Sequence, residues 1–110
     1  MKTVLITGIG GDIAQGVATI IREEKPEIRL IGIDRNLEHG GILFVDEFIQ
    51  VPSSDSSEYI EKVRDILVSR SVDVLIPLSE PELNVLAPHL NGLGNSRCIS
   101  AGEKVVSVGL

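Results

Sequence analysis

The stretch ITGIGGDIAQG, residues 6–16, places four glycines and one aspartate directly after the apolar run at residues 4–6. A β-rich run that ends in glycines and passes into helical periodicity is typical of the first strand, turn and helix of an α/β domain. Such a turn can bind the phosphates of a dinucleotide at the start of the helix, or it can face another substrate. Both functions are open at this point.

Strand-like and helical segments alternate along the rest of the chain. We expect strands at 3–7, 29–34, 48–51, 73–77 and 97–100, and helices at 12–25, after residue 58, and at 78–90. The expected apolar stripes are Ile13, Val17, Ile20 and Ile21; Tyr59, Ile60, Val63, Ile66 and Leu67; and Leu83, Leu86, Ala87 and Leu90. This alternation predicts a three-layer α/β/α Rossmann-like fold, whose parallel sheet has about five strands in the order 3-2-1-4-5.

Composition narrows the function classes. The 110 residues allow one domain, and with only three aromatic residues its core must be aliphatic, which suits strands buried on both faces. A net charge of −6 with scattered basic residues argues against nucleic-acid binding. No apolar run approaches the ~20 residues of a membrane span, and no signal peptide is present, so we expect a cytoplasmic protein.

Cysteine and histidine give no sign of a metal site or a disulfide. Cys98 is the one cysteine and is expected to be a small core residue. His39 and His89 lie far apart in the sequence and have no cluster of carboxylates around them. We therefore expect no metal in this chain.

A dinucleotide site is the first interpretation of the glycines. Gly8 and Gly10 fit the G-x-G-x-x-G fingerprint, but Ile13 takes the place of its third glycine. Asp34 ends the second strand, roughly where an acidic residue would bind the ribose of NAD. Asp12 argues against this function, because its carboxylate is expected to cap the first helix and to repel phosphate. The Tyr-x-x-x-Lys pattern of short-chain dehydrogenases is also absent, since Val63 stands four places after the only tyrosine.

The loop LSEPE, residues 78–82, follows the fourth strand. We expect Ser79 to be an N-cap and Glu82 to complete a capping box, as Asp55 and Glu58 are expected to do before the second helix. Ligands of such sheets bind beyond the carboxyl ends of the strands, near the switch point. Ser79 and Glu80, opposite the glycine turn, are therefore candidates to contact a polar small molecule.

Five stretches together resemble the N-terminal domain that precedes the ATP-grasp fold in ATP-grasp ligases. They are Thr7–Gly11, Gly32–Asp34, Val45–Pro52, Ser56–Ile60 and Asp73–Leu83. The resemblance is to the branch similar to the large subunit of carbamoyl-phosphate synthase, and it covers residues 1–105. It implies the substrate-side domain of an ATP-dependent carboxylate–amine ligase, with residues 106–110 starting a linker to an ATP-grasp domain that this chain lacks.

The resemblance also implies a site and its partners. The substrate-binding residues it points to are Gly8, Gly10, Gly11, Asp12, Ser79 and Glu80. Their ligand would be a small-molecule carboxylate or amine, and the carboxylate of Asp12 departs from the small or apolar residue usual in the family. ATP and magnesium would bind elsewhere in the parent enzyme, so we expect this chain alone to hold no cofactor or catalytic residue, to be inactive, and to self-associate where the missing domain would cover it.

Two other functions stay open beside the ligase. One is an NAD(P)-binding module of a protein similar to short-chain dehydrogenases, with Asp34 as the cofactor-binding residue and Arg35 available to a 2′-phosphate. The other is a regulatory or scaffolding domain that packs on a partner through an exposed apolar patch.

Overall fold

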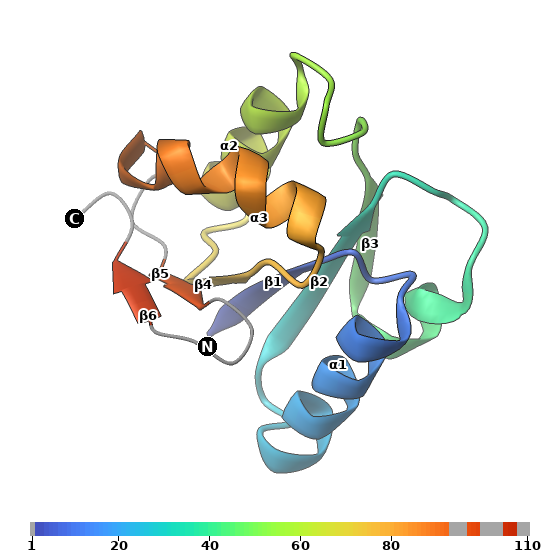
Figure 1. The fold of residues 1–110 in the computed structure, drawn as a ribbon. Helices are drawn as coiled ribbons and strands as arrows, with labels where there is room; N and C mark the ends of the chain where they lie inside the picture. The colour runs from blue at the N-terminus through green and yellow to red at the C-terminus, as the bar shows by residue number, and fades with distance from the viewer. Residues whose placement is uncertain (1, 93–96, 100–104, 108–110) are drawn as a thin grey trace.

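A single twisted sheet forms the middle layer of the fold (Figure 1). The computed structural model describes residues 2–92, 97–99 and 105–107. Within them the strand order is β3-β2-β1-β4-β5-β6, which confirms the predicted order 3-2-1-4-5. The strands are β1 (Thr3–Thr7), β2 (Arg29–Asp34), β3 (Glu47–Gln50), β4 (Val74–Ile76), β5 (Arg97–Ile99) and β6 (Val105–Ser107). All neighbours run parallel except β6, an unpredicted strand that pairs antiparallel with β5.

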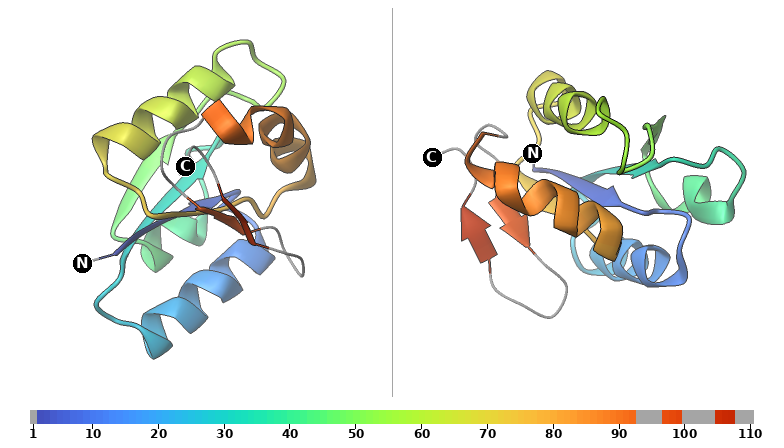
Figure 2. Two further views of the ribbon diagram at one scale, coloured as in Figure 1. Left: turned by 90° about the vertical axis from the view of Figure 1, so that its left-hand side faces the viewer. Right: turned by 45° about the horizontal axis from the view of Figure 1, so that its top comes forward.

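Helices cover both faces of the sheet (Figures 1 and 2). On one face lie α1 (Asp12–Glu24) and the 3-10 helix η1 (Gly40–Phe44), and on the other lie α2 (Tyr59–Ser69) and α3 (Glu80–Leu86). Successive side chains of a strand point to opposite faces, so β1 feeds both cores. Leu5 belongs to the cluster under α2 and α3, whereas Val4 and Ile6 belong to the cluster under α1.

The predicted boundaries differ from the observed ones by a residue or two. The third strand begins at Glu47 rather than at residue 48, and the fourth strand is shorter than 73–77 at both ends. The helix predicted for 78–90 is divided into α3 and a 3-10 helix, η2 (Ala87–Gly92), which contains Pro88. Because proline lacks an N–H and crowds the preceding turn, it does not continue a regular α-helix. Residue 100 and the side chains of Leu90 and Cys98 lie outside what the structure describes.

The apolar stripe predicted for the first helix is partly wrong. Ile13 and Ile20 are 70% and 60% exposed, whereas Ala14 and Ala18 are buried. The buried face is therefore rotated by about one residue from the prediction, because the helix lies close to the sheet through two small side chains rather than through isoleucines. For α2 the prediction is confirmed, since Tyr59, Val63, Ile66 and Leu67 are all buried.

The start of α2 also corrects a prediction. The helix begins at Tyr59 after Glu58, and no side chain caps it. Ser56 Oγ instead accepts a hydrogen bond from the Glu58 amide at 3.2 Å, so Asp55 and Glu58 form no capping box. Asp55 therefore has no capping role, and it lies in the loop between β3 and α2, at the carboxyl end of the sheet.

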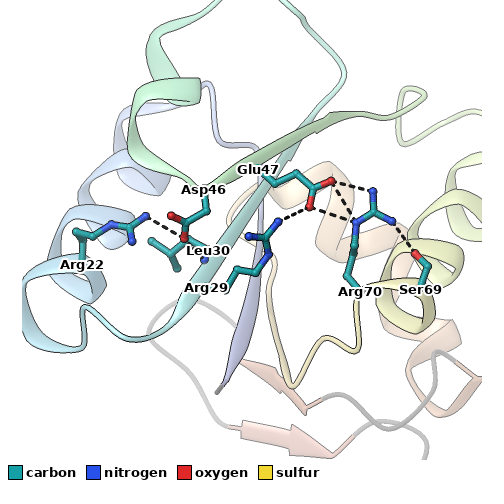
Figure 3. Close-up of polar contacts among 7 residues, drawn as sticks. All are labelled: Arg22, Arg29, Leu30, Asp46, Glu47, Ser69 and Arg70. Atoms are coloured by element: carbon teal, nitrogen blue, oxygen red, sulfur yellow. Dashed lines mark hydrogen bonds and ion pairs between the residues drawn. The ribbon is translucent and has the colours of Figure 1, made fainter.

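Charge pairs hold the amino ends of β2 and β3 together (Figure 3). Glu47 receives hydrogen bonds from Arg29 at 2.9 Å and from Arg70 at 2.8 Å. Beside it, Asp46 pairs with Arg22 at 3.2 Å and accepts a hydrogen bond from the Leu30 amide at 2.8 Å. These contacts connect both helical layers to the first residues of the two strands.

Candidate functional site

A cavity of about 480 Å³ opens at the carboxyl ends of β1 to β4. This is the edge at which parallel α/β sheets bind ligands. Its walls come from the glycine turn, the end of β2, the loop before α2 and the start of α3. The lining residues are Gly8, Asp34, Arg35, Pro52, Ser53, Ser54, Asp55, Ser79, Pro81 and Glu82.

Three of the predicted site residues line this cavity and four do not. Gly8, Asp34 and Ser79 are part of its wall. The remaining four, all outside the lining, are Gly10, Gly11, Asp12 and Glu80. Gly11, Asp12 and Glu80 are solvent-exposed, at the starts of α1 and α3.

The glycine turn and the α3 loop meet at Gly8. Gly8 has φ +64°, a backbone conformation that residues other than glycine rarely adopt. A Cβ on this residue would lie 3.3 Å from Ser79 Cβ and 3.5 Å from Glu82 Oε1. The first glycine is therefore required both by the turn and by the close approach of α3.

The backbone N–H groups of the turn are bonded within the protein. The Ile9 amide donates to the Ile33 carbonyl at 3.1 Å, and the Gly11 amide donates to the Gly8 carbonyl at 2.9 Å. Between them, the Gly10 amide donates to Asp34 Oδ2 at 2.8 Å. Three successive donors of the turn thus have protein acceptors, which leaves none of them free to bind a pyrophosphate.

The Gly32–Asp34 motif of β2 packs against this same turn and binds it through hydrogen bonds. A Cβ on Gly32 would lie 2.8 Å from Ile9 Cγ1, so only glycine leaves room for the buried Ile9 side chain. Two residues later, Asp34 binds the Gly10 amide with one carboxylate oxygen and the Asn36 amide, at 2.9 Å, with the other. The motif fixes the shape of the turn.

Asp12 does not cap α1, which corrects the prediction. The N-cap is Gly11, in extended conformation and without a side-chain hydrogen bond, and Asp12 is the first helical residue. A side chain at that position is already past the point from which a capping residue reaches the free amides. Its charge still lies at the positive end of the helix dipole.

The capping box predicted for α3 is also wrong, and its place is taken by an inward contact. Ser79 is the N-cap residue but makes no side-chain capping bond. Glu82 is turned into the protein, 9% exposed, and its Oε2 accepts a hydrogen bond from Tyr59 Oη at 2.5 Å. The hydroxyl groups of Thr7 and Ser79 also lie beside this carboxylate and lower its pKa.

Burial changes the proton affinity of both members of this pair. Burial raises the pKa of Glu82, and the negative charge of Asp34 raises it further, against the lowering effect of its hydroxyl partners. Burial, together with the Glu82 charge and hydrogen bond, also raises the pKa of the Tyr59 hydroxyl. The raised pKa keeps the Tyr59 hydroxyl group protonated, and so a donor, at neutral pH.

Glu82 is the site residue that sequence reasoning missed. It was assigned to a cap because it follows Ser79 by three residues, the spacing of a capping box. A different signal was available: Glu82 precedes the buried Leu86 by four residues and so shares its helix face. A carboxylate on the apolar face of a short helix at the ligand edge is a reason to expect a buried polar contact.

His39 lies beside the glycine turn, where a Cβ on Gly10 would be 3.1 Å from its Cδ2. Its Nδ1 accepts a hydrogen bond from the Gly41 amide at 3.0 Å, and its ring packs edge-on against Phe48 with centroids 4.9 Å apart.

Among the described residues, no group of three or more His, Cys, Asp or Glu side chains is placed to hold a metal ion. The same part of the chain has no helix that is both long and apolar enough to span a bilayer.

Comparison with known protein families shows to which family this chain belongs. The family model of the PylC-like, N-terminal domain matches residues 4–96, which is most of the chain. The chain belongs to the PylC-like N-terminal domain family. PylC is an ATP-grasp ligase, so the PylC-like match confirms the resemblance to the N-terminal domain of such ligases. A comparison with curated proteins finds no match.

Solved structures share the Rossmann-like fold of this PylC-like domain. L-threonine dehydrogenase from Clostridium difficile matches with a TM-score of 0.68 and 19% identity over 91% of this chain and 36% of its own. Glycinamide-RNase-transformylase T from Mycobacterium tuberculosis matches with a TM-score of 0.66 and 12% identity over 91% and 26%. dTDP-glucose 4,6-dehydratase from Bacillus anthracis, solved with NAD, gives 0.65 and 14% over 91% and 37%. The chain thus spans well under half of each of these proteins, and at these identities the likeness shows the fold alone.

Proposed function

We propose that this domain forms the substrate side of an ATP-dependent carboxylate–amine ligase similar to the large subunit of carbamoyl-phosphate synthase. The observation that carries the proposal is the contrast at the glycine turn. The amides of residues 9–11 are bonded within the protein, while the cavity beside them is lined by carboxylates and hydroxyl groups. Such a wall suits a ligand that donates hydrogen bonds better than it suits a phosphate.

In a reaction of this class, ATP transfers its γ-phosphoryl group to a substrate carboxylate, which gives an acyl phosphate and ADP. The nitrogen of the amine then attacks the acyl carbon, and the C–O bond to phosphate breaks with release of inorganic phosphate. The part of this chain is to bind and orient a substrate, with Ser79 and Glu82 as acceptors around the cavity. Binding of ATP and magnesium belongs, in this proposal, to the rest of the parent enzyme.

An NAD(P)-binding module is the second candidate, because Asp34 lines the cavity at the place where such modules bind ribose. Its carboxylate, however, already accepts hydrogen bonds from the Gly10 and Asn36 amides. Ribose binding would have to share or replace these contacts. The ligase function needs no such rearrangement, and we therefore favour it.

Titration with NAD separates the two functions. We expect no heat of binding at micromolar NAD by calorimetry, and no difference between wild type and Asp34→Ala in that experiment. Micromolar binding that is lost in Asp34→Ala would establish the dinucleotide module and remove the ligase proposal. The coding sequence downstream of Leu110 gives an independent test, since the ligase proposal requires an ATP-grasp domain there.

A further inference from the structure

The pair formed by Tyr59 and Glu82 joins two helices, and Glu82 lines the cavity. Tyr59 is the first residue of α2 and is fully buried, and Glu82 lies in the first turn of α3. The 2.5 Å bond from Tyr59 Oη to Glu82 Oε2 is a short one, as expected when a hydroxyl group donates to a carboxylate. Oε2 of Glu82 is therefore held in place by Tyr59.

The other oxygen of Glu82 is on the side of the glycine turn. Oε1 lies 3.5 Å from the point where a Cβ on Gly8 would stand, and Gly8 and Glu82 both line the cavity. Because Gly8 has no side chain, nothing from that residue covers Oε1. The hydroxyl groups of Thr7 and Ser79 complete the surroundings of the carboxylate.

Packing alone does not call for a carboxylate at this position. Glu82 is nine-tenths buried, its neighbours Tyr59 and Leu86 are fully buried, and the nearby Asp34 repels its charge. Burying a carboxylate without a cationic partner costs free energy, which a glutamine or an apolar residue of similar size would not. A group that is costly to the fold and borders a cavity at the ligand edge is best explained by what it binds.

We infer, on the basis of the proposed function, that Glu82 anchors a cationic, hydrogen-bond-donating group of the substrate in this cavity, with Tyr59 as the positioning residue that fixes the carboxylate. In this arrangement the ligand cation takes the place of a cationic partner, which none of the described residues provides for Glu82. Asp34, from β2, adds a second negative charge on the same side. Asp55 and Arg35, which carry opposite charges, also line the cavity.

Proton release upon binding is a consequence of this role. The raised pKa of Glu82 reflects its burial and the charge of Asp34, and a cation placed beside Oε1 opposes both effects. Binding of a cation therefore favours the ionised carboxylate and displaces its proton to solvent wherever Glu82 is still protonated in the free protein. Affinity for a cation must then rise with pH until Glu82 is ionised without ligand, and level off above that point.

The test uses 1,4-diaminobutane as the probe, followed by NMR titration of the backbone amides and of the Glu82 side-chain carboxyl carbon. We expect saturable shifts at Gly8, Ser79 and Glu82, with an apparent Kd that falls as the pH rises through the Glu82 titration. Butane-1,4-diol and succinate, of similar length but neutral and anionic, are expected to give no saturable shifts at these residues. Equal binding of the diol, or stronger binding of succinate, would overturn the inference.

Two variants separate a binding role from a structural one. Glu82→Gln keeps the size of the side chain and is expected to weaken diamine binding about tenfold or more, because the neutral amide cannot form a charge-assisted hydrogen bond with the cation. It is also expected to abolish the pH dependence. Glu61→Gln, which removes an exposed carboxylate in the first turn of α2, is the matched control and should leave both unchanged.

Tyr59→Phe tests the positioning role, and it decides the matter if Glu82→Gln does not fold. Loss of the hydroxyl group removes a bond that lowers the pKa of Glu82, so the midpoint of the pH profile should move upward and the affinity should fall about threefold to tenfold. A role in packing alone would reduce stability and leave that midpoint where it is. An unmoved midpoint, or undiminished binding by Glu82→Gln, would overturn the inference.

These outcomes are distinct from failure of the proposed function. If NAD binds at micromolar concentration through Asp34, the ligase proposal fails whatever the diamine does. If neither NAD nor the diamine binds, the inference about Glu82 fails while the ligase proposal still stands on the downstream sequence.

Discussion

The two ends of the sheet use carboxylates in opposite ways. At the amino ends of β2 and β3, Asp46 and Glu47 face arginines from α1, β2 and the end of α2 (Figure 3). At the carboxyl ends of β1 and β4, Glu82 has only hydroxyl partners among the residues that the structure describes, and it lies close enough to Asp34 to be repelled by it. The same residue type is thus neutralised at one end and left without a cation at the other.

The proton affinities follow from this difference. The Arg70 and Arg29 guanidinium groups lower the pKa of Glu47, whereas burial and the Asp34 charge raise the pKa of Glu82. For Asp46, burial raises the pKa, but the Leu30 amide and Arg22 outweigh it and the net shift is downward. The amino end therefore adds to the stability of the ionised protein, and the carboxyl end subtracts from it in a way that a cationic ligand could reverse.

The largest effect on stability is expected at the turn of the functional end. Gly8→Val places a β-branched residue at φ +64°, with its Cβ 3.3 Å from Ser79 Cβ, and should lower the free energy of unfolding by about 2–3 kcal/mol. Denaturant unfolding measures this. Gly16→Ala is the control, because Gly16 lies within α1 and a Cβ there meets no atom within 4 Å; it should stabilise by about 0.5–1 kcal/mol. A Gly8→Val protein as stable as wild type would show that α3 and the turn are not coupled.

The order of strands and helices was predictable because it depends on hydrophobic periodicity and turn residues, which can be read from short segments of the sequence. Strands at 3–7 and 29–34 were predicted to the residue, and alternation with helices then limits the sheet to few topologies. The two turns that meet at Gly8 and Ser79 follow from that topology. The overall fold and the edge of the sheet at which the cavity opens could therefore be predicted from the sequence.

The chemistry of the site was not available in the same way. Whether Ser79 and Glu82 cap a helix or turn inward depends on Tyr59, which is distant in sequence and contributes its hydroxyl group from another helix. The role of Gly32 depends likewise on the Ile9 side chain across the sheet. Short spacing rules describe contacts within one turn of helix, and they fail where a partner from elsewhere in the chain offers the better bond.

A smaller loss of stability is expected at the amino end. Glu47→Gln removes the partner of Arg29 and Arg70 and should lower the free energy of unfolding by about 0.5–1 kcal/mol at neutral pH, the range of partly exposed ion pairs. The Glu47 pKa is lowered in the folded state, so this contribution is present above the usual value of 4.5 and is lost as the pH falls through the lowered pKa. Unfolding curves between neutral and acidic pH should converge for the two proteins. A difference that persists at acidic pH would mean that Glu47 stabilises the fold through packing rather than charge.

The smallest change, and of opposite sign, is expected for Glu82→Gln. Glutamine fills the same volume and still accepts the bond from Tyr59, so the unfolding free energy at neutral pH should rise by no more than about 1 kcal/mol.

Because the Glu82 pKa is raised in the folded state, the folded protein binds more protons than the unfolded one just above the usual value of 4.5. Wild-type stability therefore falls as the pH rises through that window, and Glu82→Gln should not show this fall. The stabilities of the two proteins should thus coincide at acidic pH and separate toward neutral pH, as for the Glu47→Gln pair, but here the variant rather than the wild type is the more stable protein at neutral pH. If Glu82→Gln instead destabilises the protein at neutral pH, the buried carboxylate belongs to the framework of the fold, and the contrast between the two ends of the sheet is lost.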